Sequence, residues 1–340
     1  MLKQNTLKYN YVIFATLDIN KSEFLHIMYN DLQGYDNIIF IETPFENRPC
    51  TNFFKTLHKY HFHGYLNKYF QLPLKSFWNR YYFHAKSDTP QKMCFVFFIP
   101  SLTSSNESFF RYLRKNYPGC KMVIYLEDII ASRTRNGKNT LRLDFIERYF
   151  DLAISYDKGD CQEYGFLYYP TSYSVVNINN NSDIDNSDLF FCGAAKQRYE
   201  TITSIYREVI RHKLRCDFIV TRYGNIAKVD GVHYVPYLLP YSSYLKHMVK
   251  SNCLLDVIQS GSRGFTVRVW EALVYGKKLL TNNKEILDTP FYDERQFCYF
   301  EKITDREIRF IAQKENIEQR YRYELSPLRM LEFIDKQLAK

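Results

Sequence analysis

The sequence predicts an α/β protein with two parallel-sheet domains, and three observations lead to this prediction. Short apolar runs alternate with helix-like segments along most of the chain, which is typical of parallel sheets flanked by helices. The 340 residues, 46% of them hydrophobic, exceed one typical domain. Residues 172–187 are rich in Asn, Ser and Asp and lack periodicity. We therefore expect a first domain over 1–171, a linker over 172–187 and a second domain over 188–324.

The elements of each domain follow from apolar periodicity. In the first domain we predict strands at 11–15, 37–42, 94–99, 121–126, 152–156 and 166–169, and helices near 21–29, 107–116 and 143–149. In the second domain we predict strands at 189–192, 217–221, 233–235, 254–258 and 277–281, and helices at 200–212 and 242–250. The end of the chain, 325–340, has the pattern of an amphipathic helix.

The segment 254–283 carries the most information about function. Its apolar residues first form a short strand-like run and then recur at helical spacing, and Gly276 stands where that helix would end. A second apolar strand follows, so the unit is a βαβ crossover. The turn 261–264 brings backbone N–H groups and a helix N-terminus to the carboxyl end of a strand. Open α/β sheets bind anionic ligands at such places.

This segment resembles the donor-site motif of GT-B glycosyltransferases. It is closest to bacterial lipopolysaccharide and capsule enzymes, whose motif reads roughly GLTxRxxEALxxGKKLITTN. The matching residues are Gly264, Phe265, Thr266, Arg268, Glu271, Ala272, Leu273 and 276–282. Segments 126–128, 156–170 and 191–198 resemble other parts of the same family more loosely. The resemblance implies two Rossmann-like domains facing across a cleft, with the helix in 325–340 crossing back to the first domain.

The resemblance also implies roles for individual residues. Glu271 is expected to bind the ribose hydroxyls of a nucleotide-sugar, and the loop of Gly264, Phe265 and Thr266 to face its sugar and diphosphate. Arg268 completes this predicted set and could also pair with Glu271, three positions away on the helix. Many retaining members of the family carry a second Glu where this chain has Arg263. The stereochemical outcome therefore stays open, and Arg263 becomes a candidate for stabilising the leaving group.

A second predicted phosphate-binding element follows the strand 189–192. Gly193 begins a run of small residues that allows close approach of a ligand, and Lys196 and Arg198 follow where a helix starts. The spacing is neither that of a Walker A loop nor that of a dinucleotide fingerprint. A tight turn with solvated basic residues is the alternative interpretation.

The sequence predicts neither a metal nor another cofactor. Its D-x-D match, residues 183–185, lies in the expected linker. His58, His61 and His63 are closely spaced, but no Cys or nearby carboxylate completes a tetrahedral zinc set. We therefore expect cations and helix N-termini to stabilise the departing nucleoside diphosphate.

The general base has several candidates in the first domain. An inverting enzyme needs a carboxylate or histidine near the acceptor hydroxyl. Asp18, Glu42, Glu127 and Asp128 each follow a predicted strand. Any of them could instead cap a helix or close a turn, so the base stays unresolved among these four.

Charge suggests the kind of acceptor. The net charge is +9, and the block 51–100 holds seven Lys or Arg residues against one acidic residue, Asp88. Aromatic residues are dense across 51–83, which favours attachment to the anionic inner surface of the cytoplasmic membrane. Nucleic-acid stacking, or a solvated face over an aromatic core, would use the same residue types. The first apolar run, 11–17, is shorter than the about 20 residues of a membrane span, so we expect a cytoplasmic, peripherally attached protein.

The leading hypothesis is therefore a metal-independent hexosyltransferase. It would move a sugar from a nucleotide-sugar, UDP-hexose favoured, to lipopolysaccharide, capsule or a lipid-linked oligosaccharide. A nucleotide-sugar epimerase on the same fold is an alternative. A basic nucleic-acid-binding module is a third class, but it leaves the Glu271 segment unexplained, and no nucleic-acid partner is expected.

Overall fold

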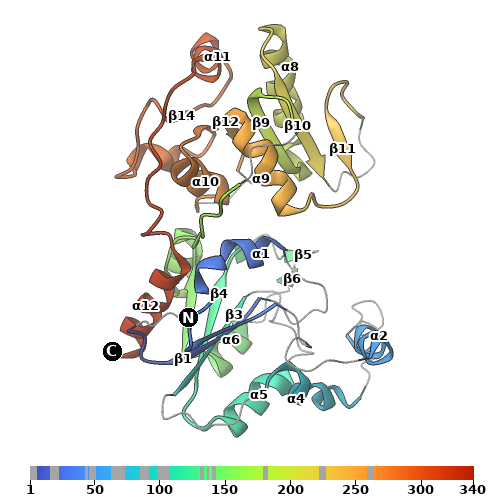
Figure 1. Cartoon of the computed structure of the whole chain (residues 1–340), viewed down its shortest axis with the longest axis vertical. Helices are drawn as coiled ribbons and strands as arrows, with labels where there is room; N and C mark the ends of the chain where they lie inside the picture. Colours follow the sequence, from blue (N-terminus) through green and yellow to red (C-terminus); the bar gives the residue numbers. More distant parts are fainter. Residues whose placement is uncertain are drawn as a thin grey trace. The chain divides into compact units, whose positions relative to one another are not determined.

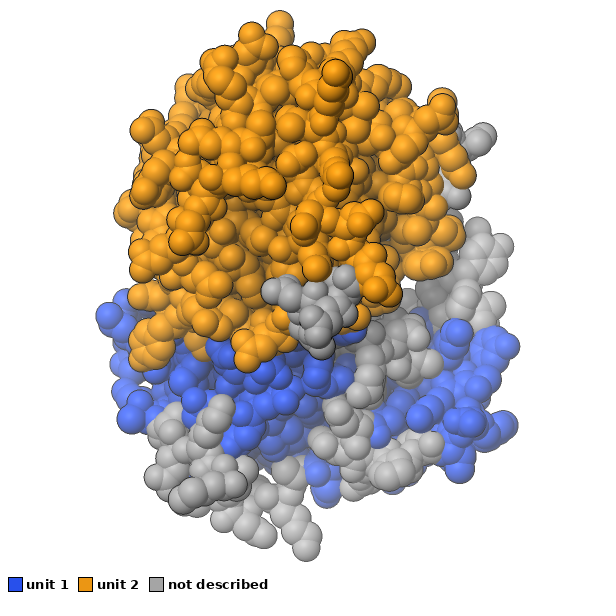
Figure 2. Space-filling model, turned by 45° about the horizontal axis from the view of Figure 1, so that its top comes forward, with its two compact units in different colours: residues 1–170, 327–340 blue, residues 171–326 orange. Residues whose placement is uncertain are grey.

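The computed structural model describes most of the chain. The described residues are 6–15, 23–42, 45, 51–62, 73–84, 92–98, 107–130, 134–135, 138–139, 143–178, 183–221, 227–258 and 264–340. They form two compact units, distinguished by colour in Figure 2. Unit 1 comprises residues 1–170 and 327–340, and unit 2 comprises residues 171–326.

Unit 1 is built on a six-stranded parallel sheet (Figure 1). Its strand order is β2-β1-β3-β4-β7-β8. The strands are β1 Asn10–Phe14, β2 Ile38–Ile41, β3 Met93–Phe98, β4 Lys121–Leu126, β7 Leu152–Ser155 and β8 Leu167–Tyr168. A separate antiparallel pair joins β5 Thr134–Arg135 to β6 Lys138–Asn139.

Helices and an aromatic core complete unit 1. The α-helices are α1 Glu23–Met28, α2 Asn52–His61, α4 Asn79–Tyr82, α5 Glu107–Asn116, α6 Leu143–Tyr149, α7 Lys158–Tyr164 and α12 Pro327–Leu338, and the 3₁₀ helices are η1 Asn30–Leu32 and η2 Lys75–Trp78. Phe14 lies at the centre of the core, stacked on Phe97 at 4.8 Å and edge-on to Phe109 at 5.4 Å. Such offset and edge-on pairs add to the stabilisation from burial alone.

The last helix, α12, belongs to unit 1. The hydroxyl of Tyr11, from β1, donates a hydrogen bond to Asp335 Oδ1 at 2.7 Å. The backbone N–H of Lys8 donates to Asp335 Oδ2, also at 2.7 Å. Asp335 is buried, and a buried carboxylate requires such partners. These two bonds connect residues more than 300 positions apart in the sequence.

Unit 2 holds a second six-stranded parallel sheet, with the order β11-β10-β9-β12-β13-β14 (Figure 1). Its strands are β9 Ser187–Ala194, β10 Cys216–Thr221, β11 His233–Val235, β12 Ser251–Asp256, β13 Lys278–Thr281 and β14 Phe297–Tyr299. Its helices are η6 Lys196–Arg198, α8 Tyr199–Arg211, α9 Tyr241–Lys250, α10 Val267–Tyr275, η7 Lys284–Asp288 and α11 Asp305–Ala312. The order corresponds to the 3-2-1-4-5-6 arrangement of dinucleotide-binding folds.

The segment expected to be a linker begins inside the packed structure. Ser172, Tyr173 and Ser174 are all buried, and the N–H of Tyr173 donates to the carbonyl of Leu325 at 2.7 Å. This bond joins the two stretches of unit 2 that lead into unit 1 along the chain. The first residues of this segment are thus packed within unit 2, although their polar composition is typical of a linker.

The segment 51–83 takes no strand of the sheet in its described residues. It forms α2, η2 and α4, packed together through two histidines. His58 Nε2 lies 2.7 Å from Tyr82 Oη, and Trp78 Nε1 donates to His61 Nδ1 at 2.8 Å. In the described part of the chain no three His, Cys, Asp or Glu side chains gather as a metal site, and His63 lies outside it. Nor do the described residues include a helix long and apolar enough to cross a membrane.

We predict that His58 makes unit 1 sensitive to acid. Burial lowers the pKa of His58 to about 3, whereas an unfolded histidine titrates near 6.5. Below about pH 6.5 the unfolded chain therefore binds a proton at His58 that the folded chain does not bind. The free energy of unfolding decreases for this reason as the pH falls from about 6.5 towards 3. Between pH 7 and pH 5 this loss amounts to about 2 kcal/mol.

The measurement is urea unfolding at both pH values for the wild type and for His58→Gln, which removes the titration. The variant should lose markedly less stability on acidification. His84→Gln, at an exposed position of unit 1, is the control and should behave as the wild type does. Equal losses in all three proteins would show that His58 does not carry the effect.

Candidate functional site

The strand order of unit 2 defines where a ligand would bind. The direction of chain connection reverses between β9 and β12, so the segments that leave their carboxyl ends diverge. Open α/β sheets bind ligands in the crevice at such a switch point. Here β9 ends at Ala194 and β12 at Asp256.

Arg268, from the first turn of α10, lies at this switch point. Its Nη2 donates to the carbonyl of Cys192, and its guanidinium stacks over the ring of Phe191 at 5.4 Å. A Cβ atom on Gly193 would lie 3.1 Å from Arg268 Nη2. Glycine at this position therefore leaves the room that the guanidinium occupies. The Arg268 side chain keeps 16% of its surface accessible.

A second guanidinium joins the ends of the two strands. Arg198 donates to the carbonyls of Ala194 and Ala195 after β9 and to that of Val257 after β12. Burial first, and the nearby charge of Arg268 second, lower the pKa of Arg198. A guanidinium carries five N–H donors, two more than these three bonds use. The switch point thus concentrates positive charge, as a phosphate-binding site requires.

Asp256 holds the start of α10 in place. Its carboxylate is fully buried and accepts hydrogen bonds from Thr266 Oγ1 at 2.9 Å and Thr281 Oγ1 at 3.0 Å. Arg268 Nη1 lies 3.8 Å from Asp256 Oδ1. Thr266 is the N-cap residue of α10, but its side chain makes no capping hydrogen bond. Since that hydroxyl is used on Asp256, it leaves the N-terminal N–H groups of α10 to other partners.

Glu271, expected to bind ribose hydroxyls, is buried among tyrosines in the structure. Its carboxylate has no exposed surface, and it accepts hydrogen bonds at 2.5 Å from the hydroxyls of Tyr241 and Tyr244, one on each oxygen. The Tyr241 hydroxyl lies 2.8 Å from that of Tyr173. Burial raises the pKa of Glu271. The tyrosines of α9 therefore supply donors of the kind that ribose hydroxyls were expected to supply.

Two other residues of the predicted donor set, Phe265 and Gly264, are buried in the structure. Phe265 is buried against Trp270 and Phe291, with ring centroids 5.9 and 6.0 Å away, so it packs rather than faces a ligand. Gly264 is buried too, and its carbonyl accepts a hydrogen bond from Asn283 Nδ2 at 3.2 Å. Lys196 is the first residue of η6, shortly after the end of β9. Its side chain is not among those that the structure describes.

Arg263 lies outside the described residues, and so does Asp18, a candidate base of the first domain.

One of the candidate bases is paired with a histidine that sequence reasoning missed. Glu42 follows β2 at the carboxyl edge of unit 1's sheet, and its Oε1 is hydrogen-bonded to Nδ1 of His26 from α1. The His26 side chain is 43% exposed and that of Glu42 only 12%. A carboxylate that orients an accessible imidazole is a familiar arrangement for proton transfer. They lie 16 positions apart in the sequence, which left no local signal of the pair.

The other carboxylates at this edge belong to the turn after β4. Glu127 and Asp128 are half-buried there, and Asp128 Oδ1 accepts the N–H of Ile129 at 3.0 Å. Asp160, from α7, accepts the N–H of Ile130 at 3.0 Å. Burial raises the pKa of Asp160 to about 6. Their hydrogen bonds to backbone N–H groups are those of turn-forming residues.

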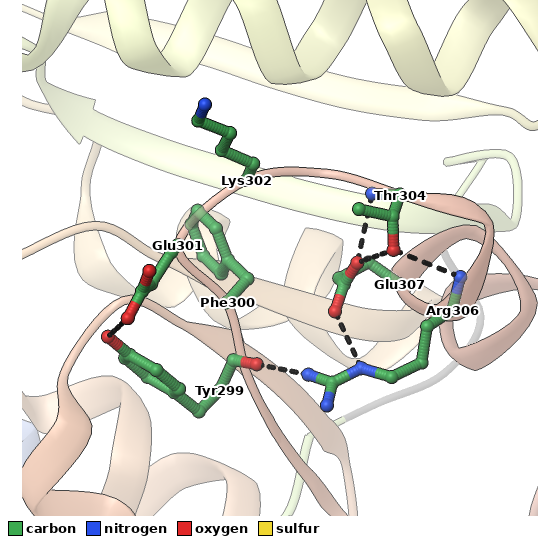
Figure 3. Close-up of a pocket in the computed structure, with 7 residues that line it drawn as sticks. All are labelled: Tyr299, Phe300, Glu301, Lys302, Thr304, Arg306 and Glu307. Atoms are coloured by element: carbon green, nitrogen blue, oxygen red, sulfur yellow. Dashed lines mark hydrogen bonds and ion pairs between the residues drawn. The ribbon is translucent and has the colours of Figure 1, made fainter.

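A pocket of about 530 Å³ lies at the end of β14 (Figure 3). Glu307 Oε2 accepts from the N–H of Thr304 at 2.9 Å and from its hydroxyl at 2.5 Å, which caps α11. Arg306 Nε donates to Glu307 Oε1 at 2.7 Å. Figure 3 shows these groups directed towards one another. Glu307 is thus used on the helix cap and on Arg306, while Glu301 accepts a hydrogen bond from the Tyr299 hydroxyl at 3.1 Å.

Comparison with known proteins identifies the fold. No model of a protein family matches the chain, and no curated protein matches it. Among solved structures, a putative UDP-N-acetylglucosamine 2-epimerase from Listeria monocytogenes matches with a TM-score of 0.50 and 10% identity, covering 97% of each chain.

Two further structures match with lower scores. One is the glycotransferase of kitacinnamycin, with a TM-score of 0.42, 9% identity and coverage of 97% of this chain and 99% of that one. The other is an alpha-glucosyltransferase in complex with UDP-glucose and DNA containing an abasic site. It matches with a TM-score of 0.46 and 12% identity, covering 96% of this chain and 92% of that one. The predicted GT-B fold is confirmed, with two parallel α/β units in one chain.

We predict that Glu271 and Tyr244 stabilise unit 2 as a pair. Tyr244→Phe leaves one buried carboxylate oxygen without its donor, which should cost about 1–3 kcal/mol of unfolding free energy. Glu271→Gln should destabilise unit 2 as well, and the double variant should lose less than the sum, with a coupling of at least about 0.5 kcal/mol. The measurement is urea unfolding of the four proteins. Tyr237→Phe, at a position 61% exposed, is the control and should change little.

A different pair of outcomes would instead support the expectation that Glu271 binds the ligand directly. In that case Glu271→Gln would lower nucleotide affinity in calorimetry, while Tyr244→Phe would leave stability unchanged.

Proposed function

We propose that this protein is a glycosyltransferase that takes a hexose from a nucleotide-sugar, UDP-hexose favoured. The observation that carries the proposal is the meeting of Arg198 and Arg268 at the switch point between β9 and β12, beside the N-terminus of α10. Nucleoside diphosphates are bound by cations and helix N-termini in such crevices. The motif of 264–282 supports a nucleotide-sugar as the ligand rather than a dinucleotide.

In the proposed reaction the diphosphate leaves with negative charge on the oxygen that held the sugar. Arg268 is the side chain best placed to neutralise that charge, because its guanidinium is already oriented by Phe191 and by the carbonyl of Cys192. Arg198 adds a second cation, and the N–H groups of α10 add a fixed dipole. Lys196, at the start of η6, and Arg263, just before Gly264 in the sequence, are further proposed contributors. A divalent metal is not required in this scheme.

Glu271 acts in this proposal through the helices it joins. Its bonds to Tyr241 and Tyr244 hold α9 against α10, and α10 carries Arg268. A rigid supporting shell of this kind keeps a binding side chain in productive geometry. We therefore assign Glu271 as a positioning residue for the donor site.

On the acceptor side we propose His26 as the general base, oriented by Glu42. The pair lies at the carboxyl edge of unit 1's sheet, and the exposed imidazole could accept a proton from a sugar hydroxyl. Asp18, Glu127 and Asp128 are the remaining candidates. A surface glycan such as lipopolysaccharide, capsule or a lipid-linked oligosaccharide is the proposed acceptor class, on the strength of the motif alone.

We predict that Arg268→Gln weakens UDP binding about tenfold to a hundredfold, since a lost charged hydrogen bond costs roughly 1.5–3 kcal/mol. Uridine, which carries no diphosphate, should lose less than about threefold. Isothermal calorimetry measures both ligands. Arg211→Gln removes an equal charge from an exposed site in the same unit and is the control. Equal losses for UDP and uridine would refute the diphosphate role of Arg268.

We also predict that sugar transfer persists in excess EDTA, because protein cations replace the metal. The assay follows UDP release from UDP-hexose with and without a glycan acceptor. Loss of turnover in EDTA with recovery on adding Mg²⁺ or Mn²⁺ would overturn the metal-free scheme.

The similarity to an epimerase structure favours a second candidate function, epimerisation of the donor sugar. An epimerase would change the donor sugar without any acceptor and without net release of UDP. Analysis of the recovered donor by NMR separates that activity from transfer.

A further inference from the structure

A further charged pocket of unit 2 lies away from the switch point, at the opposite edge of the sheet. Its volume is about 250 Å³, and its cations are Lys277 and Arg322. Lys277 directly precedes β13, and its Nζ donates to the carbonyl of Ser251, the first residue of β12. The switch point lies at the carboxyl ends of the strands, so this pocket at their amino ends is a separate place. We call it the amino-edge pocket.

Hydrogen bonds hold the walls of the amino-edge pocket in place. The Tyr275 hydroxyl, at the end of α10, donates to the carbonyl of Val176 and accepts the N–H of the same residue, both at 3.2 Å. The N–H of Arg320 donates to the carbonyl of Leu273 at 2.9 Å, which lays the segment 319–322 along the same end of α10. Stretches far apart in the sequence therefore form one pocket, and each is fixed to α10.

The two cations of the amino-edge pocket have no counter-charge. The Lys277 ammonium donates to the carbonyls of Val249 and Ser251 at 2.6 and 2.8 Å, which uses two of its three N–H bonds. No described carboxylate forms an ion pair with Lys277 or Arg322, and none is among the described residues that line the pocket. Burial lowers the pKa of Lys277 to about 8. Because a charge withdrawn from water is stabilised by a partner of opposite sign, an anion would be favoured here.

The remaining polar groups of the pocket suit hydroxyl groups. Asn177 and Gln319 contribute side-chain amides, each of which can donate and accept hydrogen bonds. Both residues are exposed, and neither side chain has a hydrogen-bond partner in the part of the chain that the structure describes. The 250 Å³ of the pocket correspond to roughly eight water molecules at about 30 Å³ each, so a bare oxyanion would leave room beside it. These features match a small molecule with one anionic group and several hydroxyls.

We propose that the amino-edge pocket binds a phosphorylated monosaccharide. Its phosphate contacts Lys277 and Arg322, which bind such groups through charge-assisted hydrogen bonds. Its sugar hydroxyls contact the amides of Asn177 and Gln319. The site is distinct from the crevice between β9 and β12, and the proposal does not depend on the function proposed for that crevice.

The test is isothermal calorimetry of the full chain with glucose 1-phosphate and glucose 6-phosphate, and with glucose and inorganic phosphate as partial ligands. The wild type should bind one of the sugar phosphates at least about tenfold more tightly than either partial ligand. Arg322→Glu places a carboxylate at an exposed position of the pocket, so this variant should keep the wild-type melting temperature. It should lose at least about tenfold in affinity, and Lys277→Gln should lose as much.

Two control variants change charge elsewhere in unit 2. Arg309→Glu reverses an exposed arginine that does not line the pocket, and Arg268→Gln alters the switch point. Both should bind the sugar phosphate within about twofold of the wild type. A loss in Arg268→Gln with none in Arg322→Glu would assign the ligand to the switch point and overturn the proposal.

Chemical labelling locates the ligand within the chain. Acetic anhydride modifies the neutral form of lysine amines, and peptide mass spectrometry reads Lys277 separately from Lys314, an exposed lysine of the same unit. A bound phosphate favours the charged ammonium, so saturating sugar phosphate should slow acetylation of Lys277 at least about threefold and leave that of Lys314 unchanged. Three results would each overturn the proposal: no binding of either sugar phosphate, affinity that survives both pocket variants, or unchanged labelling of Lys277.

Discussion

The carboxylate of Asp256 is completely buried at the end of a central strand, and the geometry of the candidate site depends on how that charge is paired. A buried ion is costly unless hydrogen bonds and opposite charge replace water. Thr266, Thr281 and Arg268 supply those partners from the two sides of the βαβ crossover. Their convergence sets where α10 begins and brings its arginine to the switch point.

A second buried carboxylate constrains the same helix one turn later. Glu271 is joined to α9 through Tyr241 and Tyr244, and through Tyr241 to Tyr173. Tyr173 in turn bonds to Leu325, where the other stretch of chain leaves unit 2. Satisfied polar networks of this kind rigidify a core and specify one arrangement. Helix α10 and both ends of unit 2 are therefore parts of one hydrogen-bonded assembly.

Unit 1 is organised mainly by aromatic packing, with the buried carboxylate of Asp335 joining α12 to β1. The rings around Phe14 fill the space between its sheet and helices, and the polar groups that could act on an acceptor lie at the carboxyl edge on short turns. The aromatic residues of 51–83 fall into two groups, one buried in the core and one exposed on the surface. Trp78 and Tyr82 are core residues, while Phe53 and Tyr60 face outward.

The sequence by itself determined the fold class and much of the element order, because periodicity reports which segments bury one face. The strand predicted at 121–126 and the helix at 107–116 have those bounds in the structure, and the helix predicted within 254–283 ends at Gly276 as expected. It missed β14, and it gave α7 no helix although Asp157 caps it.

Only the tertiary structure decided which partner each polar side chain meets. Helical spacing placed Glu271 on α10, but its two tyrosine donors come from a helix some 30 residues away. His26 and Glu42 likewise meet only through the parallel sheet. Local sequence carries the period of a helix or strand, whereas the pairing of buried polar groups is settled by which elements the sheet brings together.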